Sequence, residues 1–240
     1  MQMARVLGGR DGARSLRARK DFFTRQYQLD RAMRRALETR RDSVPGSLVA
    51  ELYAHWGDPL SQGAENFLRS CLAATTACRG DVLQCGASLA TLLLGAACAR
   101  TDGAPRHLWC LEHDGHWANV IRSWLTQYGV TNAHVIVAPA RLFDNYTWYG
   151  MDTTRLPATF GLALCDGARA TPRGVVGLAE RMADKLTPDC VVLARNVVRT
   201  ADQDYLNRWA ATRGAGCVLV DRGEGFVKIT SRNVAELSPV

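Results

Sequence analysis

The feature that most constrains the fold is an alternation of short apolar segments with longer helical ones, which begins at Asp81. Short apolar runs bounded by turn residues fit buried β-strands, whereas the segments between them have apolar residues at helical spacing. The expected strands are Asp81–Cys85, His107–Glu112, Ala133–Ala138, Gly161–Asp166, Cys190–Ala194, Cys217–Asp221 and Gly225–Ile229. The helices expected between them are Ser88–Ala99, Trp117–Tyr128, Val175–Lys185 and Asp202–Thr212.

This alternation predicts the architecture of the sheet. Five strands joined by helices form a parallel sheet with helices on both faces, because right-handed crossover connections place them there. The last two strands are separated only by Arg222, Gly223 and Glu224, so we expect an antiparallel hairpin at one edge. The fold class is therefore α/β: a Rossmann-like, doubly wound, seven-stranded sheet, mostly parallel, preceded by N-terminal helices.

Three helices are expected before the first strand. The first follows Asp21, the second follows Pro45, and the third spans about Gln62–Thr76. The chain before Asp21 has few large apolar groups to offset the cost of ordering, so we expect it to be flexible. The predicted organisation is a flexible basic arm (1–20), a helical segment packing on the core (21–79) and a Rossmann-like domain (80–240).

The positive charge of the chain is concentrated at its start. Residues 1–41 hold 12 of the 30 basic and 4 of the 23 acidic residues, a net charge of +8, which leaves −1 for the remainder. We expect solvated arginines on a helix surface here. Binding of nucleic acid, anionic lipid or an acidic partner is the alternative.

Composition favours a cytoplasmic protein. The sequence is 47% hydrophobic, which is ample for a core, yet no run approaches the roughly 18 to 20 uncharged residues that span a bilayer. No secretory signal is apparent at the start of the chain. The eight cysteines are scattered without a Cys-x-x-Cys pair and mostly lie in apolar segments, which is typical of reduced thiols in the cytosol.

Candidate binding residues stand at the carboxyl ends of the expected parallel strands, beyond which open sheets of this kind bind ligands. The first strand runs through Gly86 into a helix, and glycine adopts backbone angles closed to other residues while leaving room for a ligand. Ser88 is placed to cap that helix. Glu112 ends the second strand 26 residues after Gly86, near the spacing of about 20 at which an acid meets the ribose hydroxyls of a nucleotide.

These residues give the chain a family resemblance. From about Ser61 to the C-terminus it resembles the class I S-adenosylmethionine-dependent methyltransferases. Val82–Thr91 looks like the first cofactor motif, Leu111-Glu112-His113-Asp114 like the ribose-binding second motif, and Leu164-Cys165-Asp166-Gly167 like the fourth. The second and fourth look most like those of a broad bacterial subgroup related to catechol-type O-methyltransferases.

The resemblance implies S-adenosyl-L-methionine as the cofactor. It implies that the Gly86 turn holds the methionine end, Glu112 the ribose, and His113 with 138–140 the adenine. Asp166 would face the methyl group and could remove a proton from the acceptor. The implied cofactor residues are Gln84, Gly86, Ala87, Ser88, Thr91, Glu112, His113, Asp114, Ala138, Pro139, Ala140, Asp166 and Gly167.

The chain departs from the family pattern at several positions. Gln84 stands where the family usually has an acid for the cofactor's ammonium group, and Ser88 and Ala90 stand where it has glycine. Catechol-type enzymes bind magnesium through acids at the ends of the fourth and fifth strands, together with an Asn. Here the fifth strand ends in Arg195 and Asn196, and a cation opposes metal binding.

Substrate contacts are expected from two segments. We expect no metal, and Arg195 with Asn196 could instead bind an anionic substrate, although a solvated arginine is an equal alternative. The long loop Arg141–Pro157 includes Trp148 and Tyr149, which could cover a flat acceptor. Aromatic side chains that merely cover a helix edge are the alternative.

The resulting hypothesis is a metal-independent methyltransferase acting on a small molecule, with O-methylation favoured. A nucleic-acid methyltransferase using the basic arm is the second hypothesis, although the fourth strand ends Asp166-Gly167-Ala168-Arg169 and lacks the Pro-Pro-aromatic sequence of base-amino enzymes. The third is a binding or scaffold protein with this fold. A homodimer is a further expectation that the sequence leaves open.

Overall fold

The computed structural model of the protein describes residues 12–39, 44–56, 64–99, 105–166, 173–223 and 225–231, with the backbone alone for 12–20 and 22. The chain divides into two compact units, Met1–Glu65 and Asn66–Val240. The helix expected at Gln62–Thr76 is α3 (Glu65–Ala77), and nearly all of it belongs to the second unit. This division falls at residue 65, whereas we expected a boundary at residue 80. Within the second unit, Phe67 of α3 packs edge-on against Phe226 with ring centroids 5.2 Å apart.

The first unit contains two helices that pack against each other, α1 (Gly12–Glu38) and α2 (Gly46–Trp56). Arg35 of α1 forms an ion pair with Glu51 of α2 at 2.9 Å. Residues 12–20, which we expected to be flexible, form the start of α1 here, and their Leu, Ala, Arg and Lys are good helix formers. Residues 1–11 of that expected arm lie outside the described residues.

The second unit is built on the predicted seven-stranded sheet, in the order β3-β2-β1-β6-β7-β9-β8. The first five strands in this order are parallel, and β9 runs antiparallel to both β7 and β8. Both the parallel sheet and the C-terminal hairpin at its edge are thus confirmed. The strands are β1 (Val82–Cys85), β2 (Leu108–Glu112), β3 (Ala133–Val137), β6 (Phe160–Cys165), β7 (Leu186–Ala194), β8 (Ala215–Asp221) and β9 (Phe226–Ser231).

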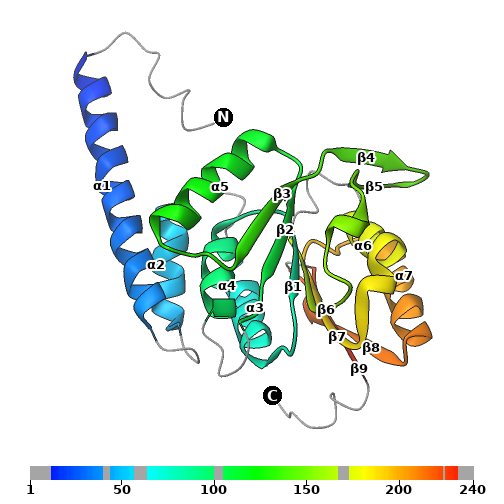
Figure 1. Cartoon of the computed structure of the whole chain (residues 1–240). Coiled ribbons are helices and arrows are strands. Elements are labelled where there is room, and N and C mark those ends of the chain that lie inside the picture. Colours follow the sequence, from blue (N-terminus) through cyan, green and yellow to red (C-terminus); the bar gives the residue numbers. More distant parts are fainter. Residues whose placement is uncertain are drawn as a thin grey trace. The chain divides into compact units, whose positions relative to one another are not determined.

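Helices cover both faces of this sheet, as Figure 1 shows, with α4 and α5 on one face and α6 and α7 on the other. Because α4 is apolar all round, nearly all its residues are buried, whereas α5 buries one stripe. The elements are α4 (Leu89–Ala99), α5 (Gly115–Gln127), α6 (Gly174–Met182) and α7 (Thr200–Thr212), with short 3-10 helices at Thr153–Arg155 and Ala183–Lys185.

The segment expected to be a long loop begins as a second, two-stranded sheet. Strands β4 (Ala140–Phe143) and β5 (Tyr146–Tyr149) form an antiparallel hairpin whose turn places Asp144 at φ 35°. The hairpin packs on α6 because Trp148 lies directly over Gly177 of that helix.

Two general properties of the chain also emerge. All eight cysteines are free, as predicted. Over the described residues, no helix is both long and apolar enough to cross a membrane.

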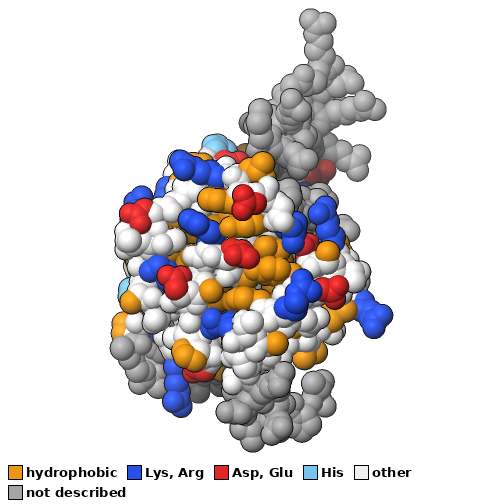
Figure 2. All heavy atoms as spheres, turned by 90° about the vertical axis from the view of Figure 1, so that its right-hand side faces the viewer, with side chains coloured by type: hydrophobic (Ala, Val, Ile, Leu, Met, Phe, Trp, Pro, Cys, Tyr) orange, Lys and Arg blue, Asp and Glu red, His pale blue; other side chains and the backbone are white. Residues whose placement is uncertain are grey.

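Figure 2, which faces the right-hand side of Figure 1, shows apolar, basic and acidic side chains interspersed on that surface.

The close approach of α6 to the hairpin gives a stability prediction. A Cβ atom added at Gly177 would lie 2.5 Å from Cε3 of the buried Trp148 ring, so Gly177→Ala should lower the free energy of unfolding by about 1–3 kcal/mol despite its better helix propensity. Chemical denaturation measures this. Gly115→Ala in α5 is the matched control, because its Cβ would meet nothing closer than 3.7 Å. Equal stabilities for the two variants would contradict the packing described.

Candidate functional site

The candidate site lies at the carboxyl ends of the central strands, where the order of the sheet reverses. The chain proceeds from β1 to β2 on one side and returns to β6 on the other, and such a switch point is where open α/β sheets bind ligands. Cys85 pairs in register with both Leu111 and Cys165. This register places the residues that follow these strands side by side.

The turn after β1 has the geometry that its glycine predicts. Gly86 has φ 96°, a left-handed conformation that side-chain-bearing residues rarely adopt, and its N–H donates to Leu111 O at 2.9 Å. The Ser88 hydroxyl accepts from Ala90 N at 3.2 Å, which confirms Ser88 as the cap of α4.

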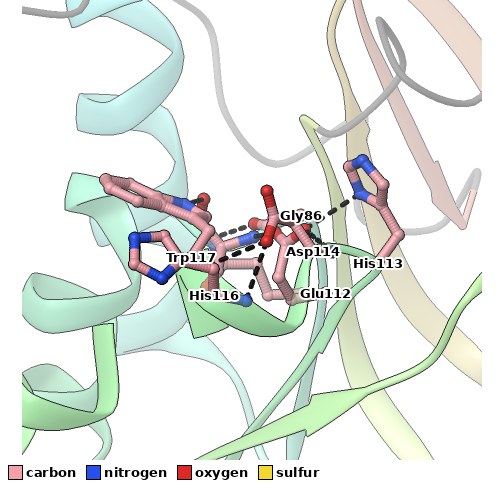
Figure 3. Close-up of polar contacts among 8 residues, drawn as sticks. Gly86, Glu112, His113, Asp114, His116 and Trp117 are labelled. Carbon is pink, nitrogen blue, oxygen red and sulfur yellow. Dashed lines mark hydrogen bonds and ion pairs between the residues drawn. The ribbon is translucent and has the colours of Figure 1, made fainter. Parts of the chain in front are cut away.

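Glu112 joins this turn to the end of β2. Its Oε2 accepts from Ala87 N at 2.8 Å, while its Oε1 accepts from Asp114 N at 2.8 Å and contacts His113 Nδ1 at 2.9 Å. Figure 3 shows the carboxylate between the two turns. Glu112 is 3% exposed, so these donors replace the water that a buried charge needs. The predicted proximity of the Gly86 turn and Glu112 is confirmed.

Trp117 is a contact that the sequence analysis missed. Its indole Nε1 donates to Ala87 O at 2.8 Å, so the Ala87 residue is held through both its N–H and its carbonyl group. Asp114 caps α5 by accepting from His116 N at 2.8 Å and Trp117 N at 3.1 Å. Hydrogen bonding from the Trp117 N–H, and then from that of His116, lowers the pKa of Asp114. In the sequence, the only signal for this contact was the position of Trp117, an aromatic residue three positions after the helix cap Asp114.

Gln84 and Thr91 lie inside the turn. Gln84 is 1% exposed, and its Nε2 donates to Gly86 O at 3.0 Å. Its Oε1 is buried and has no hydrogen-bond partner within the described part of the chain. The Thr91 hydroxyl, fully buried, accepts from Ser88 N at 3.0 Å. Thr91 therefore shapes the turn from within, whereas Gln84 retains an unused acceptor.

The ends of β6 and β7 are joined by an ion pair. Nε and Nη2 of Arg195 each lie 2.7 Å from Oδ1 of Asp166, and the side chains are 9% and 15% exposed. The Arg195 guanidinium also lies over the Phe67 ring, 5.7 Å from its centroid. The pKa of Cys71 is raised mainly by burial and further by Asp166, while Arg195 lowers it. Asp166 and Arg195 thus interact with each other, which the sequence analysis did not predict.

The remaining predicted residues lie around these two groups. Ala138 is buried and donates its N–H to Glu112 O at 2.8 Å, whereas Pro139 and Ala140 are exposed beside it in the chain. Asn196 has φ 65°, and its buried Nδ2 has no partner within the ranges described. Gly167 lies outside the described residues.

In this structure the side chains of Trp148 and Tyr149, which we expected to cover a flat acceptor, lie in the core. They are 2% and 3% exposed and pack edge-to-face at 5.0 Å within the core. Burial, with smaller effects from Cys85 and Cys165, raises the pKa of Tyr149. The alternative that these aromatic rings cover a helix fits Trp148, because it packs on Gly177 of α6.

Comparisons with known proteins identify the class of fold. No protein-family model and no curated protein sequence matches this chain. Among solved structures, it is similar to an O-methyltransferase from Bacillus cereus in complex with SAH (14% identity, 96% of each chain, TM-score 0.52). It is also similar to a provisionally identified caffeoyl-CoA O-methyltransferase from Staphylococcus aureus (12% identity, 78% of this chain and 99% of that one, TM-score 0.50). The chain has the class I methyltransferase fold, as expected.

The Asp166–Arg195 pair can be tested by its contribution to stability. Arg195→Met should lower the free energy of unfolding by about 3 kcal/mol, because it removes the guanidinium that compensates the charge of a largely buried carboxylate. Adding Asp166→Asn should recover part of that loss. Arg199→Met, at an exposed position, is the control. Strictly additive effects of the two substitutions in denaturation experiments would show that the pair does not form.

Proposed function

We propose that this protein is an S-adenosylmethionine-dependent methyltransferase that acts on a small molecule, with O-methylation favoured. The observation that carries the proposal is the direct contact between the Gly86 turn and Glu112 at the switch point of the sheet. The fold supports it, and so does the bound SAH of the Bacillus cereus O-methyltransferase that this chain resembles.

The residues of the site fit this cofactor. The unused Gln84 Oε1 is an acceptor suited to the cofactor's ammonium group, and a buried acceptor without a partner costs about 1–3 kcal/mol. Glu112 would accept the ribose hydroxyls, and His113 with the exposed Pro139 and Ala140 would border the adenine. When bound, the cofactor supplies a methyl group on a sulfonium ion, and the protein's task is mainly to align the acceptor with it.

The Asp166–Arg195 pair supports catalysis without a metal. A divalent cation prefers several anionic oxygen ligands, whereas here the guanidinium already neutralises the carboxylate, so the donor set does not fit magnesium. We propose that the Asp166–Arg195 pair orients the oxygen of the methyl acceptor. Removal of the acceptor's proton by Asp166 remains a prediction. Asn196 Nδ2 could donate to the same acceptor.

Three further proposals concern the location of the protein, its partners and its assembly. The eight free thiols support a cytoplasmic location. Nucleic-acid binding through residues 1–41 and a homodimer remain predictions. The third hypothesis is a non-catalytic scaffold, which is favoured by the uncharged Gln84 in place of an acid for the cofactor's ammonium group. Binding of SAH would distinguish the enzyme from this scaffold.

The proposal predicts SAH binding that depends on Glu112. Calorimetry should detect binding to the intact protein, and Glu112→Gln should weaken it by at least about tenfold, because an amide cannot accept through both of its polar atoms. Asp189→Asn, an exposed acid in β7, should bind like the parent protein. Thermal unfolding checks that each variant is folded. Absence of heat at millimolar SAH would instead support the scaffold.

Restoring an acid at residue 84 gives a second prediction. Gln84→Glu should tighten binding of S-adenosylmethionine by about tenfold, because a carboxylate pairs with the ammonium group, while a charge at this 1% exposed position lowers the stability of the ligand-free protein. Calorimetry and thermal unfolding measure the two effects. Unchanged or weaker binding by a folded variant would place the ammonium group elsewhere.

A further inference from the structure

The Glu112 carboxylate has little hydrogen-bonding capacity left for a ligand. Two ionised oxygens accept about four hydrogen bonds, and three donors already approach them. Two of these donors, including the imidazole of His113, lie on Oε1, and one lies on Oε2. A ligand with one hydroxyl could use the remaining position on Oε2. A ribose, which presents two neighbouring hydroxyls, needs a further position on Oε1.

The three donors differ in how readily they can leave. Ala87 N belongs to the Gly86 turn, and the carbonyl group of Ala87 accepts a hydrogen bond from the Trp117 indole, which fixes the turn. Asp114 N belongs to the residue that caps α5, so withdrawing it would disturb the start of that helix. His113 donates from a side chain that is 36% exposed, and in Figure 3 its ring lies to one side of the carboxylate, with the Nδ1 contact drawn as a dashed line. Rotation of one side chain is enough to remove it.

We propose that the His113 imidazole is an internal competitor, which occupies Oε1 of Glu112 in the free protein and is displaced when a ribose binds. This inference rests on the proposed function and assigns His113 a role in setting the affinity of that site. In the free protein, the contact helps to compensate the charge of this buried carboxylate. In the complex, a ribose hydroxyl takes its place and the released ring lies beside the adenine position.

Such a competitor predicts effects of opposite sign on stability and on affinity. His113→Phe retains an aromatic ring but removes the Nδ1 donor, so the free protein should unfold at a lower temperature. SAH should bind the same variant about tenfold more tightly, equivalent to about 1.4 kcal/mol, because no internal contact must be broken first. A residue that merely supported the structure would weaken both properties when replaced.

The matched control is His116→Phe, since His116 is also exposed and lies on the opposite side of Glu112 in Figure 3. It should leave both the unfolding temperature and the affinity for SAH unchanged. Calorimetry and thermal unfolding supply these two readouts, without any methyl acceptor. Equal or weaker binding by folded His113→Phe would overturn the inference, even where the intact protein binds SAH.

Nuclear magnetic resonance of the imidazole nitrogens tests displacement directly. In the free protein, His113 should show a protonated, hydrogen-bonded Nδ1, identified by its loss in His113→Phe and its change in Glu112→Gln. Saturating SAH should abolish that signature. A signature absent from the free protein, or unchanged at saturation, would overturn the inference alone. Failure of SAH to bind both the intact protein and His113→Phe would overturn the proposed function with it.

Discussion

A buried carboxylate fixes the geometry of the site. Glu112 is almost inaccessible to water, and an ionised group in such a place is tolerated only where donors surround it. Those donors come from the turn after β1 and from the turn after β2, so the charge holds two separate loops at one spacing. The parallel register of β1 and β2 brings the loops level, and Glu112 then determines how they meet.

The second half of the site follows the same physical rule. Asp166 and Arg195 compensate each other at the ends of β6 and β7, and Phe67 from α3 packs against the guanidinium. The charged groups on both sides of the switch point therefore have partners within the protein. By contrast, the buried Oε1 atom of Gln84 has no hydrogen-bond partner among the described residues. A ligand with a cationic end and two hydroxyls complements this pattern, because it supplies what Gln84 lacks and can exchange with a donor on Glu112.

Local patterns in the sequence were sufficient for the framework of this site. The alternation of strands and helices, the glycine at residue 86 and the acid ending β2 each act over a few residues, and the topology of the sheet then brings them together. Contacts across long separations could not be read in this way. The pairing of Asp166 with Arg195 and the bond from Trp117 to Ala87 depend on side-chain directions that no spacing encodes. The β4–β5 hairpin was missed because the aromatic residues of this segment suggested a loop covering the acceptor, although its Asp144-Asn145 pair favours a turn.

A crystal structure of the protein with SAH at saturating concentration is the most direct test of the central claim. The account predicts electron density for the nucleoside across the Gly86 turn, with both ribose hydroxyls within hydrogen-bonding distance of the Glu112 carboxylate. Density for SAH at another edge of the sheet, or density that leaves Glu112 without contact to the ribose, would contradict it.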